Sequence, residues 1–188
     1  DALGQLIAVT YPDGRRVTYT YDAAGNRITV AENGIETAYT TNNMNQYVEA
    51  GDAVYTFDAD GNMTSKTDAD GTTAYEYDIE NRLIRVTLPN GDMWEYTYDA
   101  LGNRVAVAHN GVMARYVHDP IGFVDVAAEY DGDGGLAARY VHGFGLVARI
   151  DGTGDPAYYA FDAVGHTRQL TDASGAVANA YDYDPFGI

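Results

Sequence analysis

The chain has 188 residues, a formal net charge of −17 and no cysteine, and hydrophobic residues make up 46% of it. This hydrophobic share excludes a disordered acidic tail, and the lack of cysteine excludes a disulfide framework, a zinc–thiolate site and a cysteine nucleophile. The 11 basic residues are scattered among 28 acidic ones, which disfavours nucleic-acid binding because phosphate contacts need clustered Lys and Arg.

A short string, Tyr-Asp-x-x-Gly-Asn-Arg, recurs along the chain and predicts one tight turn per copy. Clear copies begin at Tyr21 and Tyr98, and a variant begins at Phe57. A further copy begins at Tyr77 and has Asn81 in place of the glycine; asparagine is the next best residue in a left-handed conformation. Another copy, which lacks its Tyr, occupies residues 1–7, and a degenerate copy occupies residues 42–46.

A second series of glycines lies between these copies, mostly 20 or 21 residues apart, and predicts a second turn in each repeat. Several of its members follow Asn or Asp, and Asn-Gly and Asp-Gly are the strongest short hairpin signals. Each repeat of about 20 residues is therefore predicted to hold two turns and two short strands. The series is Gly14, Gly34, Gly51, Gly71, Gly91, Gly111, Gly132, Gly152 and Gly175.

The strands themselves are predicted from alternation of aromatic or β-branched residues with polar ones. Val17, Tyr19 and Tyr21 show this pattern, and the returning strand carries Ile28 and Val30. No segment has a helical period, so the prediction is an all-β fold of tandem hairpins with aromatic ladders across neighbouring strands. Open sheets rarely exceed about ten strands, so we expect a curled or spiralling antiparallel sheet. The aromatic pairs are Tyr55/Phe57, Tyr75/Tyr77, Tyr96/Tyr98, Tyr159/Phe161 and Tyr181/Tyr183, with His in the second place at Tyr116/His118 and Tyr140/His142.

These motifs resemble RHS/YD repeats over essentially the whole chain. Residues 1–115 are interpreted as a regular repeat array, and residues 116–188 resemble the divergent segment that leads into the RHS-associated core. In that segment, residues 140–146, 162–175 and 181–187 resemble the family stretches YVHGxGL, DxLGSTRxLTDxxG and YDYDPFG, with His166 where the family usually has Ser.

The resemblance implies a wall segment of a spiralling β-shell that encloses a toxin or another passenger domain, in a secreted or cell-surface protein. The implied partners are the rest of the shell and that passenger, and the segment would have no catalytic site, no metal and no cofactor of its own. Self-association through open sheet edges is also expected. No apolar run reaches the roughly 18 residues of a membrane span, and no signal peptide is visible in this piece.

Alternatives remain open for several residue types. Asp182 and Asp184 are two residues apart and could perform acid–base chemistry in an autoprotease. The competing interpretation is that these aspartates brace turns through hydrogen bonds to the backbone. Three D-x-D-G strings, beginning at Asp58, Asp68 and Asp131, lack the twelfth-position Glu of a calcium loop. Neither Ser65 nor Ser174 lies in a hydrolase elbow.

The histidines and tyrosines carry the last two alternatives. His118 and His142 could bind a metal if they lay together. The simpler interpretation is that each imidazole ring takes the place of the second aromatic ring of its pair. A second candidate function is glycan or partner-protein recognition through exposed aromatic rings outside the ladder. The tyrosines best suited to it are Tyr11, Tyr47 and Tyr130.

Overall fold

A computed structural model describes residues 1–121 and 124–183, and in that part of the chain the regular elements are eighteen β-strands with no helix. Every assigned strand pairing is antiparallel, so the all-β prediction is confirmed. Contacts divide the chain into two units, Asp1–Asp92 and Met93–Ile188.

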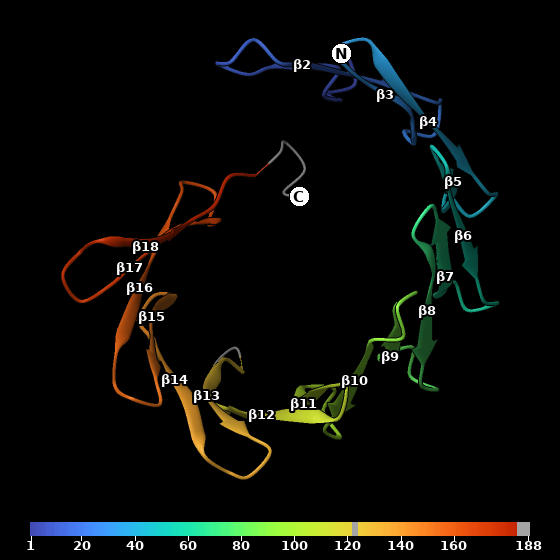
Figure 1. Ribbon diagram of the computed structural model, residues 1–188. Helices are drawn as coiled ribbons and strands as arrows, with labels where there is room; N and C mark the ends of the chain where they lie inside the picture. Colours follow the sequence, from blue (N-terminus) through green and yellow to red (C-terminus); the bar gives the residue numbers. More distant parts are fainter. Residues whose placement is uncertain (122–123, 184–188) are drawn as a thin grey trace. The chain divides into compact units, whose positions relative to one another are not determined.

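The first unit is a meander in which each strand pairs with the next one along the chain (Figure 1). Consecutive pairing of this kind needs only short connections, which the repeated turn strings supply. The strands are β1 (Ala8–Thr10), β2 (Arg16–Tyr21), β3 (Arg27–Glu32), β4 (Ile35–Thr41), β5 (Tyr47–Ala50), β6 (Ala53–Phe57), β7 (Met63–Asp68), β8 (Gly71–Tyr77) and β9 (Leu83–Thr87).

The second unit repeats this arrangement with its own nine strands, again paired in chain order. The strands are β10 (Met93–Tyr98), β11 (Arg104–His109), β12 (Val112–His118), β13 (Val126–Asp131), β14 (Leu136–His142), β15 (Leu146–Asp151), β16 (Pro156–Phe161), β17 (Thr167–Thr171) and β18 (Val177–Ala180).

Two kinds of connection alternate in the first unit. The Tyr-Asp-x-x-Gly loop joins β2 to β3 and is followed by a one-residue shift in register, because Thr20 faces Thr29 whereas Tyr21 faces Arg27. Such a shift is a β-bulge, which increases the local twist of the strand pair. At the other end of β3 the two-residue connection causes no shift. Its residues Asn33 and Gly34 have φ values of 49° and 88°, as the predicted Asn-Gly hairpin turn requires.

The left-handed positions agree with most of the predicted turns but correct two of them. Asn81, with φ of 61°, takes the conformation predicted for it. In the second glycine series, however, Gly132 and Gly152 are not left-handed, and Gly134 and Gly154 are, with φ of 87° and 101°. The reason is that Asp131 and Asp151 each start an Asp-x-x-Gly loop, and its fourth residue is the left-handed one.

The two faces of each sheet differ, as strand alternation requires. The aromatic face carries most of the tyrosines, and at several rungs a ring lies opposite an aliphatic residue: Tyr19 opposite Val30, Tyr75 opposite Val86, and Tyr96 opposite Val107. The prediction of aromatic rings stacked on directly neighbouring strands is therefore wrong at these rungs. At these rungs an aliphatic strand separates two aromatic ones, whereas Tyr39 on β4 contacts Tyr47 on the neighbouring β5 and Trp94 on β10 stacks on His109 on β11.

Few side chains are fully buried, because each sheet has one layer in the described residues. The most buried apolar residues are Val17 and Tyr19 on β2, together with four alanines of the second unit. Most rings of the aromatic face are half-buried. Stability therefore depends on many cross-strand pairs, each contributing roughly 0.2–1 kcal/mol, and on the loops.

Candidate functional site

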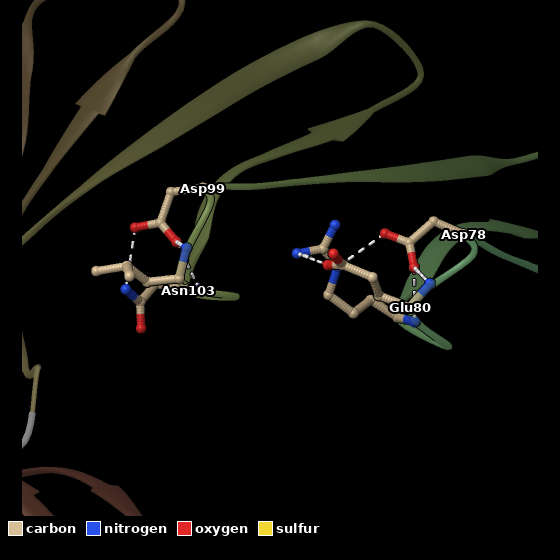
Figure 2. Close-up of polar contacts among 6 residues, drawn as sticks. Asp78, Glu80, Asp99 and Asn103 are labelled. Carbon is tan, nitrogen blue, oxygen red and sulfur yellow. Dashed lines mark hydrogen bonds and ion pairs between the residues drawn. The ribbon is translucent and has the colours of Figure 1, made fainter.

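The recurring aspartate of each loop is a turn brace. In the loop that begins at Asp99, its Oδ1 accepts hydrogen bonds from the backbone N–H groups of Leu101 and Asn103, each at 2.9 Å (Figure 2). Its Oδ2 accepts a third bond from the Asn103 side-chain amide at 3.0 Å. The carboxylate thus satisfies backbone donors that the turn leaves without a strand partner.

The same brace recurs with different partners. Asp78 Oδ1 accepts hydrogen bonds from the backbone N–H groups of Glu80 and Arg82, and its Oδ2 lies 2.7 Å from Arg82 Nε. Asn42 does the same with an amide, since its Oδ1 accepts from the N–H groups of Met44 and Gln46. Braced loops of this type begin at Asp22, Asp58, Asp131, Asp151, Asp162 and Asp172.

These hydrogen bonds stabilise the charged form of the carboxylates. The Asn26 side chain, followed by the Asn26 backbone N–H, lowers the pKa of Asp22 below its ordinary value of 3.8. The pKa values of Asp58 and Asp99 are lowered first by the side chains of Asn62 and Asn103. A general acid near neutral pH needs a raised pKa, so these groups have the opposite character and fit the turn-bracing interpretation.

In the first unit the loops of successive repeats are bonded to one another. The Asn26 amide donates to Asn45 Oδ1 at 2.9 Å, and Gln46 Nε2 donates to the Gly61 carbonyl at 2.9 Å. The Asn62 amide donates to Asn81 Oδ1 at 2.8 Å. These side chains form a chain of amide hydrogen bonds, here called the amide ladder, along one end of the strands.

The D-x-D-G strings show no arrangement for calcium beyond this bracing. Asp58 is engaged by the backbone N–H groups of Asp60 and Asn62, and Asp68 forms an ion pair with Lys66 at 2.7 Å. Within residues 1–121 and 124–183, no group of three or more His, Asp or Glu side chains is placed to hold a metal ion.

His142, one of the two histidines in the predicted aromatic pairs, is held by a backbone carbonyl and a carboxylate. His142 Nε2 lies 3.0 Å from the Val126 carbonyl oxygen, and its Nδ1 lies 3.7 Å from Asp125 Oδ2. Tyr21 and Tyr183 make the equivalent bond, from their hydroxyl groups to carbonyl oxygens 15 or 16 residues earlier. A carbonyl oxygen only accepts, so His142 donates from Nε2 in the place of a tyrosine hydroxyl.

The other candidates named from sequence are scattered. Asp182 forms an ion pair with Arg168 at 2.6 Å and its side chain is 94% exposed, while Asp184 lies outside the described residues. Ser65 is bonded to Thr56, and Ser174 to Asp172. Each serine hydroxyl is thus tied into a cross-strand or turn bond.

Of the three tyrosines assigned to sites outside the ladder, Tyr47 was placed wrongly. Its ring makes an edge contact with Tyr39 at 5.3 Å between centroids, and its hydroxyl accepts the Arg27 backbone N–H. A bulge at Val48 separates the pairs Thr40–Glu49 and Thr41–Tyr47 and turns Tyr47 to the aromatic face. Tyr11 lies under the Arg15 guanidinium, 3.8 Å from the ring centroid. Tyr130 lies on the opposite face, in register with Arg115.

Sequence reasoning missed a charged cluster on the aromatic face of the second unit. The Tyr140 hydroxyl donates to Glu129 Oε1 at 2.7 Å, and Arg149 lies 3.5 Å from Glu129 Oε2. Burial, followed by the hydrogen bond to Glu129, raises the pKa of Tyr140 to about 12. The residues come from β13, β14 and β15, and the signal for them was a Glu on β13 and an Arg on β15, at aromatic-face positions of the two strands that flank Tyr140.

The sequence comparisons agree with this geometry. The family profile of the teneurin YD shell matches residues 1–187. The tRNA3(Ser)-specific nuclease WapA of Bacillus spizizenii is 33% identical over 192 residues, covering 98% of this chain and 8% of that protein. The probable deoxyribonuclease RhsB of Dickeya dadantii is 42% identical over 65 residues, or 32% of this chain and 4% of that protein. The chain therefore spans only a small part of the curated relatives it matches.

Two solved structures show limited similarity to the chain. A crystal structure of TcdB2-TccC3 matches with a TM-score of 0.46 and 13% identity, covering 100% of this chain and 15% of that one. The Photorhabdus luminescens Tc holotoxin pore matches with a TM-score of 0.41 and 15% identity, covering 96% and 14%. Separately, the described residues contain no helix with the length and hydrophobicity of a membrane span.

Proposed function

Because the chain belongs to the teneurin YD-shell family of RHS/YD-repeat proteins, we propose that it is a non-catalytic structural module. It would form a wall segment of a β-shell that encloses a toxin or another passenger domain. Its partners would be the remainder of the shell and that passenger, and it would act in a secreted or cell-surface protein. It would also self-associate through unpaired strand edges when isolated.

One observation carries this proposal: the aspartates that recur once per repeat are used to hold loops. The brace carboxylates bind backbone N–H groups within their own turns, and hydrogen bonding lowers their pKa values. The amide ladder then links one repeat to the next. A chain whose polar side chains are engaged once per repeat is suited to building an extended wall.

A segment exchange tests the wall role. The matching stretch of the Bacillus spizizenii relative would be replaced by this chain, and the hybrid would be treated with trypsin at low concentration. We expect the hybrid to resist cleavage as well as the unaltered relative does. A matched hybrid carrying Asp99→Ala, which removes one loop brace, should be cleaved faster. Equal and rapid cleavage of both hybrids would contradict the wall role.

Catalysis is tested on the isolated chain. The relatives are named as nucleases, so the purified chain would be incubated with tRNA and with DNA, with and without magnesium. We expect no cleavage. Cleavage that survives repurification and is lost in one substituted variant would overturn the non-catalytic proposal.

A recognition module remains the second candidate, and one pocket favours it. A cavity of about 480 Å³ on the aromatic face of the first unit is lined by rings that include Tyr39, Tyr47 and Tyr55, with the Gln46 amide beside them. Aromatic walls with a few polar groups are typical of small-ligand sites. Glycan-array binding that Tyr55→Ala abolishes and Tyr130→Ala spares would support this candidate, and an array without signal would remove it.

A further inference from the structure

The face opposite the aromatic one changes character between the two units. In the first unit it carries hydroxyl and charged residues that bond across strands: Thr20 with Thr29, Thr56 with Ser65, and Glu76 with Arg85. From β11 to β16 of the second unit, the register places mainly apolar residues on it. The larger ones include Met113, Val117, Tyr130, Leu136, Val141, Ile150 and Tyr158.

These apolar side chains are exposed, and part of the surface that they form is hollowed into a groove. Val117, Val141 and Tyr158 are 49%, 42% and 44% exposed. Ala148 lies in register between Val141 and Tyr158, so a small residue separates two larger ones. A groove of about 510 Å³ includes Met113, Val117 and Tyr130 in its lining. Contiguous exposed apolar surface of this kind marks an interaction site.

The charge of this face is opposite to that of the chain. Arg115 and Arg139 lie on it, in register with Tyr130 and Ala128 respectively, whereas the strand positions of this face from β11 to β16 hold no Asp or Glu in the described residues. Arg115 makes one long contact, 3.5 Å to the Gly132 carbonyl oxygen. A chain of net charge −17 thus presents an apolar face with two cations and no anion.

We propose that this face of β11–β16 is a docking surface for an extended polypeptide segment in which apolar and acidic residues alternate. Apolar side chains would fill the groove beside Tyr130, and carboxylates would pair with Arg115 and Arg139. The charge complementarity selects an acidic partner, and the strongly negative chain would repel an anionic lipid surface. This role goes beyond that of a wall segment.

The test measures fluorescence anisotropy of labelled peptides of about nine residues with the 188-residue chain. One peptide alternates Glu and Leu, a second alternates Lys and Leu, and a third alternates Glu and Ser. We expect the Glu/Leu peptide to bind at least about tenfold more tightly than the other two, since both apolar and charged contacts are needed. Equal binding of the Glu/Leu and Lys/Leu peptides, or no binding of any peptide, would overturn the proposal.

Variants locate the site. Arg115→Glu with Arg139→Glu should weaken Glu/Leu binding by about tenfold, because two attractions become repulsions. The control, Arg16→Glu with Arg85→Glu, makes the same change in net charge in the first unit and should leave binding unchanged. If both pairs weaken binding equally, the effect is one of net charge and the proposal fails.

A second pair keeps the strands intact while removing the apolar surface. Val117→Thr with Val141→Thr preserves β-branching and copies the hydroxyl-rich face of the first unit, and it should also weaken binding. Sedimentation velocity on the same samples detects a competing occupant. A dimer of the parent chain that these two substitutions dissolve, with no peptide binding, would assign the face to a second copy and overturn the peptide proposal.

Discussion

The two units share one strand order and hold it by different means. In the first unit, repeats are tied through the amide ladder, as at Asn62 and Asn81, and the opposite face carries hydroxyl pairs. In the second unit, the link between repeats lies on the aromatic face, where Glu129 joins Tyr140 and Arg149. The hairpin meander therefore constrains backbone geometry closely and side-chain chemistry loosely.

The connections between strands also differ between the two units. In the first unit short connections such as Asn33-Gly34 alternate with braced loops. In the second unit braced loops also occupy the other end of the strands, at Asp131, Asp151 and Asp172. A bulge accompanies two of these three loops, between β13 and β14 and between β17 and β18, whereas the register between β15 and β16 is unshifted.

The largest expected effect is a difference in unfolding free energy between alanine substitutions at two glycines of the second unit. A Cβ at Gly152 would clash with the carbonyl oxygen of Leu136, whereas a Cβ at Gly132 would make ordinary contacts with Met113. Gly152→Ala should lower the free energy of unfolding by about 2–3 kcal/mol, as overpacking against a fixed backbone does. Gly132→Ala should change it by less than about 0.5 kcal/mol. Urea denaturation measures both, and equal losses would contradict the assigned backbone.

The next effect tests the left-handed position of a braced loop. Gly102 has φ of 86°, and a Cβ added there would have no neighbour within 4 Å, so a substitution is opposed by backbone conformation alone. Gly102→Val should cost about 1–2 kcal/mol. Gly145 also has free space but no left-handed φ, and Gly145→Val serves as the control. If both variants unfold at the same urea concentration as the parent chain, the loop assignment is wrong.

A smaller difference in stability is expected between a side chain of the amide ladder, Asn62, and one that braces only its own loop, Asn103. Asn62→Ala removes bonds to its own loop and to Asn81, while Asn103→Ala removes the bond to Asp99. At about 1 kcal/mol per hydrogen bond, Asn62→Ala should cost roughly 1 kcal/mol more than Asn103→Ala. Differential scanning calorimetry of the two variants measures the difference, and a larger loss at Asn103 would reverse the comparison between the units.

The smallest effect per loop is the dependence on acid. Brace carboxyls with lowered pKa values, Asp22 and Asp172 among them, stabilise the fold above their ordinary value of 3.8 and lose that contribution as pH falls through their lower folded values. The free energy of unfolding should therefore be level from pH 7 to 5 and fall below about pH 4.

Asp172→Asn is the matched variant for the acid experiment. It keeps an Oδ1 that can accept from Ser174 and Ala176 N–H groups, as Asn42 does in the first unit, and it does not titrate. Its acid-induced loss of stability should be smaller than that of the parent chain. An identical loss would show that Asp172 contributes nothing to the pH dependence.

The fold was readable from sequence because its signals are local. Turn strings fixed the hairpins, and Asn81 could be placed in a left-handed turn from residue type alone. Side-chain positions that depend on the strand register across bulges could not be predicted from the sequence. Tyr47 changes face because Val48 is bulged, and Glu129 meets Tyr140 and Arg149 only once three strands are in register. The glycine at 152 looked like a turn residue because its spacing matched the series, while its actual role is a close backbone contact.

The central claim is that the recurring aspartates brace turns, and titration of their carboxyl carbons by NMR tests it most directly. The prediction is that Asp22, Asp58 and Asp99 titrate below 3.8 and that added calcium leaves their signals unchanged. Midpoints at or above 3.8, or signals that shift with calcium, would contradict the claim and assign these carboxylates to chemistry or to metal binding.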